Sequence, residues 1–351
     1  MASSTIAEPA TAVTGGIDTH ADVHVAAALD QRGVLLGTAS FPTSPVGHRQ
    51  LELWLAGFGP IDVVGVEGTG AWGAGIARHL AAAGHRVVEV DRPDRKTRYR
   101  RGKSDTIDAE AAARAVQAGT ATGAPKARTG IVESVRALRV ARRSAIKDRS
   151  AAAHQLHSLV STAPDELRTQ LRGLPVRQLV ATCAALRPGD LTDPTQATKA
   201  ALRSIARRHQ RLTDDITELD AQLEPLIRQA APPSLLERSG VGIDVAGQLL
   251  VTAGDNPDRL RSAAAFANLC GVAPIPIASG RSSAYRLNRG GDRAANAALY
   301  RIVLCRLRWD PDTRAYIDKK IKEGKTKKGA IRCLKHYIAR EIYNDLRQLT
   351  P

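Results

Sequence analysis

A run of apolar residues in the middle of the chain has the spacing of one long amphipathic helix. Eight positions follow one another at alternating intervals of three and four residues. This is the heptad pattern of a coiled-coil seam, and at about 1.5 Å per residue it would span nearly 40 Å. We interpret His209, the one polar member, as a tolerated residue that helps to set the register. The positions are Leu202, Ile205, His209, Leu212, Ile216, Leu219, Leu223 and Leu226.

A seam of this length needs a partner helix. The arginine-rich segment 131–160 has a helical pattern and could supply the partner within the chain, or a second subunit could supply it in trans. Pro232 and Pro233 end the helix, because proline lacks the backbone N–H that a helix requires. At roughly 100–200 residues per domain, the 351 residues leave room for a separate domain on either side of this helical region.

The N-terminal region has the local patterns of an α/β domain. Three strand-like runs come first, and helical and strand-like runs then alternate. The expected strands are 13–18, 23–29, 34–41, 61–66 and 86–90, and the expected helices are 44–58, 72–83 and one from Asp105. This order predicts an RNase H-like (RuvC-like) domain. A Rossmann domain would not begin with three strands, and it would carry a glycine-rich phosphate-binding turn.

Four carboxylates lie where this topology would bring them together. Asp18 ends the first strand, and Glu67 directly follows the strand 61–66. Asp105 and Asp108 are three residues apart at a helix start, so they share one helix face. The first and fourth strands are neighbours in an RNase H-like sheet, and the last helix packs beside them. Two Mg²⁺ ions about 3.5–4 Å apart would compensate the four charges and hold a scissile phosphate.

Each acid also has a purely structural interpretation. Asp105 and Asp108 could be an N-cap and a first-turn acid of the helix. Glu67 could be a turn residue, and Asp18 could close an Asx turn at the strand end. The coincidence of all four at these positions favours the metal site. We interpret the nearby His20 and His24 as scaffold residues or DNA contacts rather than as ligands.

The charge of the chain is strongly positive and unevenly distributed. Lys and Arg number 51 and Asp and Glu 35, a formal charge of +16 that indicates a polyanionic partner. Residues 15–90 carry a net −3, residues 91–104 a net +5 and residues 286–351 a net +10. With 3% aromatic residues, base stacking is not the expected main mode of binding.

The basic segment directly before Asp105 is the main candidate for phosphate contacts. A solvated run of charge is the alternative interpretation, but the position beside a candidate metal ligand favours nucleic acid. The seven cations are Arg92, Arg95, Lys96, Arg98, Arg100, Arg101 and Lys103.

Several classes of protein are not expected. No apolar run approaches the ~18 residues of a membrane span. The first 13 residues carry Glu8 and no Lys or Arg, so we expect a flexible tail rather than a signal peptide. The four cysteines are far apart and form no C-x-x-C motif, which fits a reducing cytoplasm better than a disulfide scaffold or a zinc finger.

Short motifs follow one another in a characteristic order. Gly-Ile-Asp-Thr-His occupies 16–20, Glu-Gly-Thr-Gly 67–70 and Lys-Ser-Asp-Thr-Ile-Asp-Ala 103–109. Ser-Gly-Val-Gly at 239–242, the stretch 266–280 and Arg-Gly-Gly at 289–291 come later. In order and spacing they resemble the DEDD insertion-sequence transposases of the one-ten type, relatives of the pilin-gene invertases. The resemblance covers nearly all of the chain after residue 14.

The resemblance implies a domain organisation. A flexible tail over 1–13 would precede a RuvC-like DEDD metal domain over 14–128. A helical coiled-coil linker would occupy 129–232. A mainly helical C-terminal transposase domain with a helix-hairpin-helix-like start would occupy 233–351.

The resemblance also implies a nucleophile, Ser279, that forms a covalent phosphoserine with DNA. From chemistry alone Ser279 is an ordinary loop serine beside a glycine, and Ser282 and Ser283 are rival candidates. Further nucleic-acid contacts are expected from the cations around the serine and in the C-terminal region. These are Arg281, Arg286, Arg289, Lys327 and Lys328.

The implied partners are donor and target DNA, a structured non-coding bridge RNA from the element, and further copies of the chain. Dimers would assemble into tetramers, in which the acids of one subunit work with the serine of another. The protein would be cytoplasmic and would associate with the bacterial nucleoid during activity. Two alternatives are a metal-only RuvC-like junction-resolving nuclease and a non-catalytic nucleic-acid-binding protein that dimerises through its heptads.

Overall fold

The computed structural model describes residues 12–90, 104–279 and 282–348. The chain divides into two compact units. The first contains the N-terminal residues to Thr129 together with Ala253–Arg261, and the second contains Gly130–Thr252 together with the chain from Ser262. The basic segment Arg92, Arg95, Lys96, Arg98, Arg100, Arg101 and Lys103 lies outside the described residues, as does Arg281.

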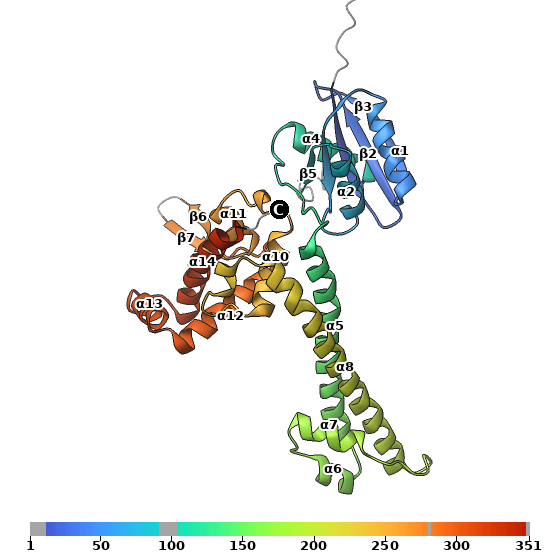
Figure 1. Cartoon of the computed structure of the whole chain (residues 1–351), viewed down its shortest axis with the longest axis vertical. Coiled ribbons are helices and arrows are strands. Elements are labelled where there is room, and N and C mark those ends of the chain that lie inside the picture. Colours follow the sequence, from blue (N-terminus) through green and yellow to red (C-terminus); the bar gives the residue numbers. More distant parts are fainter. Residues whose placement is uncertain (1–11, 91–103, 280–281, 349–351) are drawn as a thin grey trace, which may run out of the picture. The chain divides into compact units, whose positions relative to one another are not determined.

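The first unit contains a five-stranded mixed sheet (Figure 1). Its strands are β1 (Val13–Thr19), β2 (Val23–Leu29), β3 (Leu35–Pro42), β4 (Ile61–Glu67) and β5 (Val87–Val90). They are arranged in the order β3-β2-β1-β4-β5. The first three strands pair antiparallel, whereas β1–β4 and β4–β5 pair parallel. The expected strands are therefore present, and the first and fourth are neighbours.

Three helices cover the sheet: α1 (Pro45–Ala56), α2 (Ala74–Ala82) and α4 (Asp105–Gln117). Leu51 and Leu55 of α1 and Ile76 and Leu80 of α2 pack into one core with β1, β2 and β4. On the other face, α4 packs against β4 and β5 through Ala112 and Val116 and against β2 through Ala109. The central strands of the sheet are therefore buried on both faces, whereas β3 at its edge is partly exposed.

Local sequence explains where the first helix begins. The side chain of Ser44, at the N-cap of α1, accepts a hydrogen bond from the backbone N–H of Gly47, and Pro45 occupies the first turn. Both are favoured at these positions, because the hydroxyl pairs a free N–H and proline has none to lose.

The second unit begins with a helical arm. Its helices are α5 (Ile131–Ser161), α6 (Asp165–Leu171), α7 (Val176–Ala184) and α8 (Pro194–Ala230). α8 packs along α5. The two run antiparallel, since Arg142 pairs with Asp220 whereas Arg208 pairs with Gln155 farther along α5. The partner of the long helix is therefore a helix of the same chain.

The buried face of α8 is broader than the expected seam. Leu202, Ile216 and Leu223 are buried, but so are Ala206 and Ile227, each one residue beyond an expected seam position. An α-helix has 3.6 residues per turn, so a straight helix drifts away from a strict 3.5-residue repeat. α7 also packs against α8, which buries positions that a two-helix contact would leave exposed.

The remainder of the second unit is mainly helical. It contains α9 (Pro233–Leu236), α10 (Ile243–Ala253), α11 (Ala263–Leu269), α12 (Arg293–Trp309), α13 (Pro311–Lys322) and α14 (Lys327–Leu346). A two-stranded antiparallel hairpin, β6 (Ile275–Ser279) and β7 (Ser282–Arg286), interrupts the helices.

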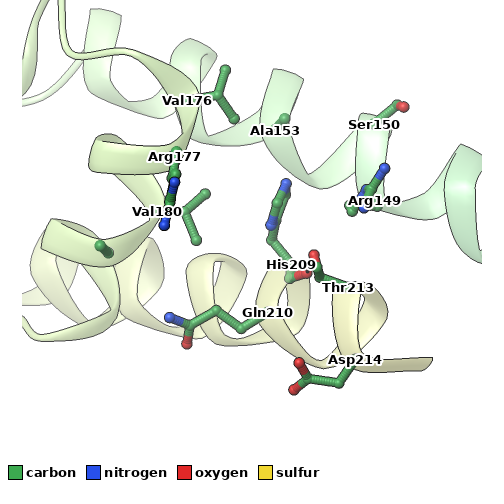
Figure 2. Close-up of a pocket in the computed structure, with 11 residues that line it drawn as sticks. Arg149, Ser150, Ala153, Val176, Arg177, Val180, His209, Gln210, Thr213 and Asp214 are labelled. Carbon is green, nitrogen blue, oxygen red and sulfur yellow. Dashed lines mark hydrogen bonds between the residues drawn. The ribbon is translucent and has the colours of Figure 1, made fainter. Parts of the chain in front are cut away.

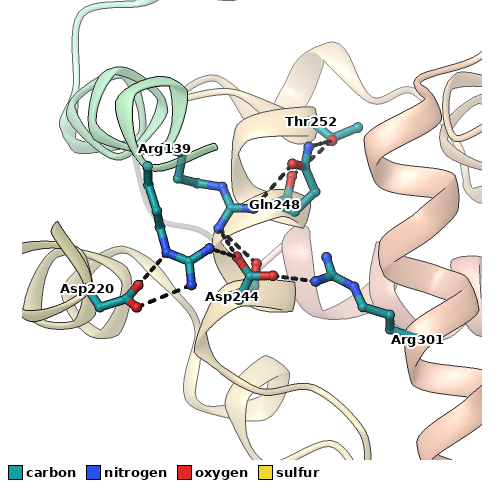
Figure 3. A network of polar contacts seen from close by, with 7 residues as sticks. Arg139, Asp220, Asp244, Gln248, Thr252 and Arg301 are labelled. Atoms are coloured by element: carbon teal, nitrogen blue, oxygen red, sulfur yellow. Dashed lines mark hydrogen bonds and ion pairs between the residues drawn. The ribbon is translucent and has the colours of Figure 1, made fainter. Parts of the chain in front are cut away.

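An ion-pair network centred on Asp244 connects α5, α8, α10 and α12 (Figure 3). Asp244 Oδ1 lies 2.9 Å from Arg139 Nη1 and 3.2 Å from Arg142 Nη1, and its Oδ2 lies 2.5 Å from Arg301 Nη1. Arg142 also pairs with Asp220 of α8. Although burial opposes ionisation, the guanidinium groups of Arg139 and Arg301 hold the pKa of Asp244 below its usual value. The network thus fixes the helical arm to the rest of its unit.

No helix among the described residues combines the length and the apolar character needed to cross a membrane.

Candidate functional site

The candidate site is built on two neighbouring parallel strands. Successive side chains of a strand alternate between the faces of a sheet, so Gly16, Asp18 and His20 lie in one row along β1 and beyond its end. Gly65 and Glu67 form a matching row on β4. Because Ile17 pairs with Val66, Asp18 and Glu67 follow at equivalent positions, and both are buried.

The glycines in these rows allow α4 to lie directly on the sheet. A Cβ atom on Gly16 would lie 2.2 Å from the carbonyl oxygen of Ala109, and one on Gly65 would lie 2.7 Å from that of Ala112. Any larger residue would push the helix away, since real Cβ atoms do not approach backbone so closely. The close approach brings the first turn of α4, with Asp105 and Asp108, next to the end of β1.

Three side chains meet at this point. His20 Nε2 lies 3.1 Å from Asp18 Oδ2 and 3.4 Å from Asp105 Oδ1. One ligand atom from each of Asp18, His20 and Asp105 lies within 4.8 Å of the others. Asp18 is buried and Asp105 is exposed, so the group opens to solvent on the α4 side.

The electrostatics of the group favour a cation. Burial raises the pKa of Asp18, and the nearby charges of Asp108 and Asp105 raise it further, while His20 opposes the shift. The carboxylates therefore repel one another at short range in a partly desolvated place. Carboxylate oxygens are the ligands preferred by Mg²⁺, and an imidazole is compatible with several divalent ions. The donor set fits a divalent cation without specifying which one.

The two remaining predicted ligands lie at the same end of the sheet. Asp108 and Glu67 are buried, 4% and 7% exposed, but neither belongs to the three-residue group. The backbone carbonyl of Glu67 accepts a hydrogen bond from Thr19 Oγ1 at 2.9 Å. Ser104 occupies the N-cap position of α4, so Asp105 is not the helix cap that one structural interpretation required.

His20 is the residue that sequence reasoning left out of the site. The sequence predicts a scaffold residue or a DNA contact, yet one ring nitrogen of His20, Nε2, lies 3.1 Å and 3.4 Å from two candidate ligands. The signal was its spacing, two residues after Asp18, which places both side chains on one face if the chain continues extended.

His24 belongs to the scaffold. It is fully buried and stacks on His48, with ring centroids 5.5 Å apart. Neither of its ring nitrogens has a hydrogen-bond partner. Burial lowers the pKa of His24 to about 4, and His48 adds to the effect. The ring is therefore neutral at pH 7 and acts as an apolar part of the core.

The candidate nucleophile lies in the second unit. Ser279 is the last residue of β6, and its backbone pairs with that of Ser282 on β7. Among the predicted nucleic-acid contacts that the structure describes, all are exposed: Arg286, Arg289, Lys327 and Lys328. Arg286 ends β7, and the two lysines begin α14.

His209 lines a cavity of about 700 Å³ between α5, α7 and α8 (Figure 2). Polar neighbours include Arg149, Gln210, Thr213 and Asp214. Burial lowers the pKa of His209, and the charge of Arg149 lowers it further. A neutral, half-buried ring beside other polar groups agrees with its interpretation as a tolerated polar residue on the helix face.

Two family models match the chain. The DEDD transposase model of the IS110 family, described as a transposase, matches residues 15–163. A second model, described as a transposase of the IS116/IS110/IS902 family, matches residues 233–318. The first match contains all four predicted carboxylates, and the second contains Ser279.

Two curated relatives have similar sequences. The IS900 insertion element uncharacterized 42 kDa protein of Mycobacterium paratuberculosis is 30% identical over 141 residues, which are 40% of this chain and 35% of the relative. The IS110 insertion element uncharacterized 43.6 kDa protein of Streptomyces coelicolor is 36% identical over 111 residues, 31% of this chain and 27% of the relative. The matched part thus spans about a third of each relative. With both family models matched in order along the sequence, the chain belongs to the IS110 family of insertion-sequence transposases.

Proposed function

We propose that the protein cuts and rejoins DNA strands during the transposition of an insertion sequence. The observation that carries the proposal is the convergence of Asp18, His20 and Asp105 in the region that matches the DEDD transposase model. Buried Glu67 and Asp108 at the same end of the sheet support it. The strand order β3-β2-β1-β4-β5 supports an RNase H-like domain as its scaffold.

In this proposal Asp18, Glu67, Asp105 and Asp108 hold divalent cations, with Mg²⁺ as the expected ion and two ions as the expected number. Bound there, the metal would polarise the scissile phosphate and lower the pKa of an attacking hydroxyl. The imidazole of His20 would hold the carboxylate of Asp18 in position through their 3.1 Å contact. The proximity of α4 to the sheet keeps the acidic groups in place before metal binds.

We assign the nucleophile to Ser279. Its Oγ would attack the phosphorus atom, a phosphoserine bond would form, and the bond to one sugar oxygen would break. The leaving sugar oxygen takes up the proton that the hydroxyl of Ser279 has lost. A hydroxyl of a second strand would then attack the phosphoserine, rejoin the DNA and return the proton to Ser279. One phosphodiester replaces another, so no ATP is required.

The proposal includes an RNA guide and an assembly. A bridge RNA would pair with donor and target DNA, and Arg286, Arg289, Lys327 and Lys328 would contact the backbones, along with the basic segment before Asp105. Dimers would form tetramers in which the acids of one subunit meet the serine of another. Sequencing the RNA that copurifies with the protein tests the guide. The proposed guide is wrong if recombination with Mg²⁺ proceeds equally without that RNA.

A covalent-adduct assay tests the chemistry. End-labelled DNA, Mg²⁺ and copurified RNA are incubated with the protein, and a labelled protein band is sought under denaturing conditions. We expect the Ser279→Ala variant to lose the adduct while it still binds DNA. The matched variants Ser282→Ala and Ser283→Ala should retain it. A normal adduct with Ser279→Ala would reassign the nucleophile, and DNA hydrolysis without an adduct in any variant would favour a metal-only nuclease.

A further inference from the structure

A cavity of about 430 Å³ in the second unit combines aromatic and cationic side chains. Its walls come from the turn after α11, from the end of β7 with the residues that follow, and from α14 with the residues before it. A cavity of this size is within the range of small-ligand sites, about 300–1,000 Å³. One wall of the cavity is formed by the end of β7, the strand that follows Ser279 in the hairpin. Another wall is formed by the basic start of α14.

Among the described residues, the charged side chains that line this cavity are all positive. Its lining includes Arg286, Lys325, Arg332 and Lys335, and no Asp or Glu is part of it. Another cavity of the same unit, which is lined by Arg139, Arg142 and Arg301, also contains the carboxylates of Asp244 and Asp292.

One lysine of the cavity, Lys335, is half-buried beside another cation. Lys335 donates a hydrogen bond to Asn296 Oδ1 at 2.6 Å. Burial lowers the pKa of Lys335, and the neighbouring charge of Arg332 lowers it further. The positive charge of the cavity would be relieved by an anionic ligand.

Two tyrosine rings line this cavity and are accessible to solvent. Tyr285 on β7 is 71% exposed, and Tyr337 on α14 is 48% exposed. The ring of Tyr337 makes T-shaped contacts with the rings of Tyr316 and His336, whose centroids lie 6.0 Å and 6.1 Å away. Rings that stay accessible beside cations are the recurrent platform for unpaired bases.

We propose that this cavity binds one unpaired nucleotide of the DNA strand on which the protein acts. Its base stacks on Tyr285 or Tyr337, and its phosphate lies among Arg286, Lys325 and Arg332. The choice of DNA rests on the proposed function of Ser279. Tyr285 is three residues from Ser282, the backbone partner of Ser279, which is about 10 Å at ~3.3 Å per residue. The cavity would therefore lie within reach of a strand held at Ser279, at a distance of a few nucleotides.

The test measures binding of single-stranded oligodeoxynucleotides, without metal and without strand transfer. At about 1–3 kcal/mol per stacked base, Tyr285→Ala or Tyr337→Ala should weaken binding about 5- to 150-fold at the affected position. Tyr285→Phe and Tyr337→Phe keep the ring and should bind within about twofold of the unmodified protein. Tyr300→Ala, which removes an exposed tyrosine of α12 outside the cavity, is the matched control.

An abasic position walked along the oligonucleotide identifies the base. When the abasic position coincides with the nucleotide in the cavity, the DNA should bind the unmodified protein and the double variant Tyr285→Ala/Tyr337→Ala with equal affinity. The reason is that no base remains to stack on the tyrosine rings. The proposal is overturned if Tyr300→Ala weakens binding as much as the cavity variants, or if the phenylalanine variants are as weak as the alanine variants. A loss seen with RNA and not with DNA of the same sequence would overturn the choice of DNA.

The result is separable from the proposed chemistry. A loss of binding in the tyrosine variants supports the cavity even if Ser279→Ala keeps its covalent adduct. Conversely, an adduct that depends on Ser279 does not rescue the cavity if the tyrosine variants bind DNA normally.

Discussion

The Nε2 atom of His20 lies 3.1 Å from the Oδ2 atom of Asp18. The contact joins a histidine beyond the end of β1 to a buried carboxylate within that strand. Asp105 Oδ1 lies 3.4 Å from the same nitrogen. His20 is thus placed either to coordinate a metal directly or to orient the carboxylates that do.

Replacement of His20 by alanine should weaken divalent-metal binding about 10- to 100-fold, the usual cost of losing a residue that orients a ligand. Titration calorimetry with Mn²⁺ measures the affinity. Asp22→Asn, which changes an exposed aspartate in the same loop, should bind Mn²⁺ normally. Equal affinities for His20→Ala and the unmodified protein would show that the imidazole does not support the site.

Replacement of Gly16 by alanine should also weaken metal binding, although Gly16 carries no ligand. Its new methyl group would lie 2.2 Å from the carbonyl oxygen of Ala109, so α4 must move and take Asp105 and Asp108 with it. In Gly15→Ala the methyl group would meet only the side chains of Leu55 and Val64 on the other face. Calorimetry should therefore show the larger loss for Gly16→Ala, and an equal loss in both variants would contradict this role for Gly16.

Removal of cations from residues 92–103 should reduce DNA affinity without changing sequence preference. Each lost phosphate contact should make the slope of log affinity against log salt about 0.9 less steep for B-DNA. Binding measured across a salt series for Arg100→Ala/Arg101→Ala tests this. An unchanged slope would show that these arginines contact no phosphate.

The first unit should lose stability as the pH falls from about 6.5 to about 4. The pKa of His24 is lowered to about 4 in the folded state, from 6.5, so the unfolded chain binds more protons in this range. At 1.36 kcal/mol per pKa unit, the free energy of unfolding falls by up to about 3 kcal/mol, and this residue adds no further loss below pH 4.

Urea denaturation at several pH values measures this loss. Trp54 packs against Phe41 and Phe58 in this unit, so a Trp72→Phe/Trp309→Phe background makes its fluorescence the reporter. His24→Phe should flatten the dependence on pH between 4 and 6.5. His154→Phe, at an exposed site on α5, should leave it unchanged. A His24→Phe variant with the original slope would show that another group titrates.

Asp244→Asn should destabilise the second unit by about 2–3 kcal/mol. The substitution removes the carboxylate that Arg139, Arg142 and Arg301 share, and breaking a largely buried pair is costly. Asp220→Asn removes a carboxylate that is 49% exposed and should cost about 1 kcal/mol or less. Far-UV circular dichroism during urea denaturation reports on this helix-rich unit, and equal losses would contradict the central role of Asp244.

Patterns that repeat within one element were sufficient to predict much of the first unit. The strand-like and helical runs of this unit depend on neighbours two to four residues away, so they can be recognised in the sequence. The same local logic located Asp18 and Glu67 at strand ends and Asp105 at a helix start. It also indicated that residues 202–226 form a helix with one buried face.

The sequence by itself therefore determined the order of the elements and the approximate positions of the acids. Only the tertiary structure decided that α5 covers α8, that His20 joins Asp18 and Asp105, and that Tyr285 and Tyr337 share a cavity. These relationships depend on how closely elements far apart in the chain can pack. At Gly16 that distance is set by a missing Cβ atom, and its consequence for the site becomes visible only when α4 lies against β1.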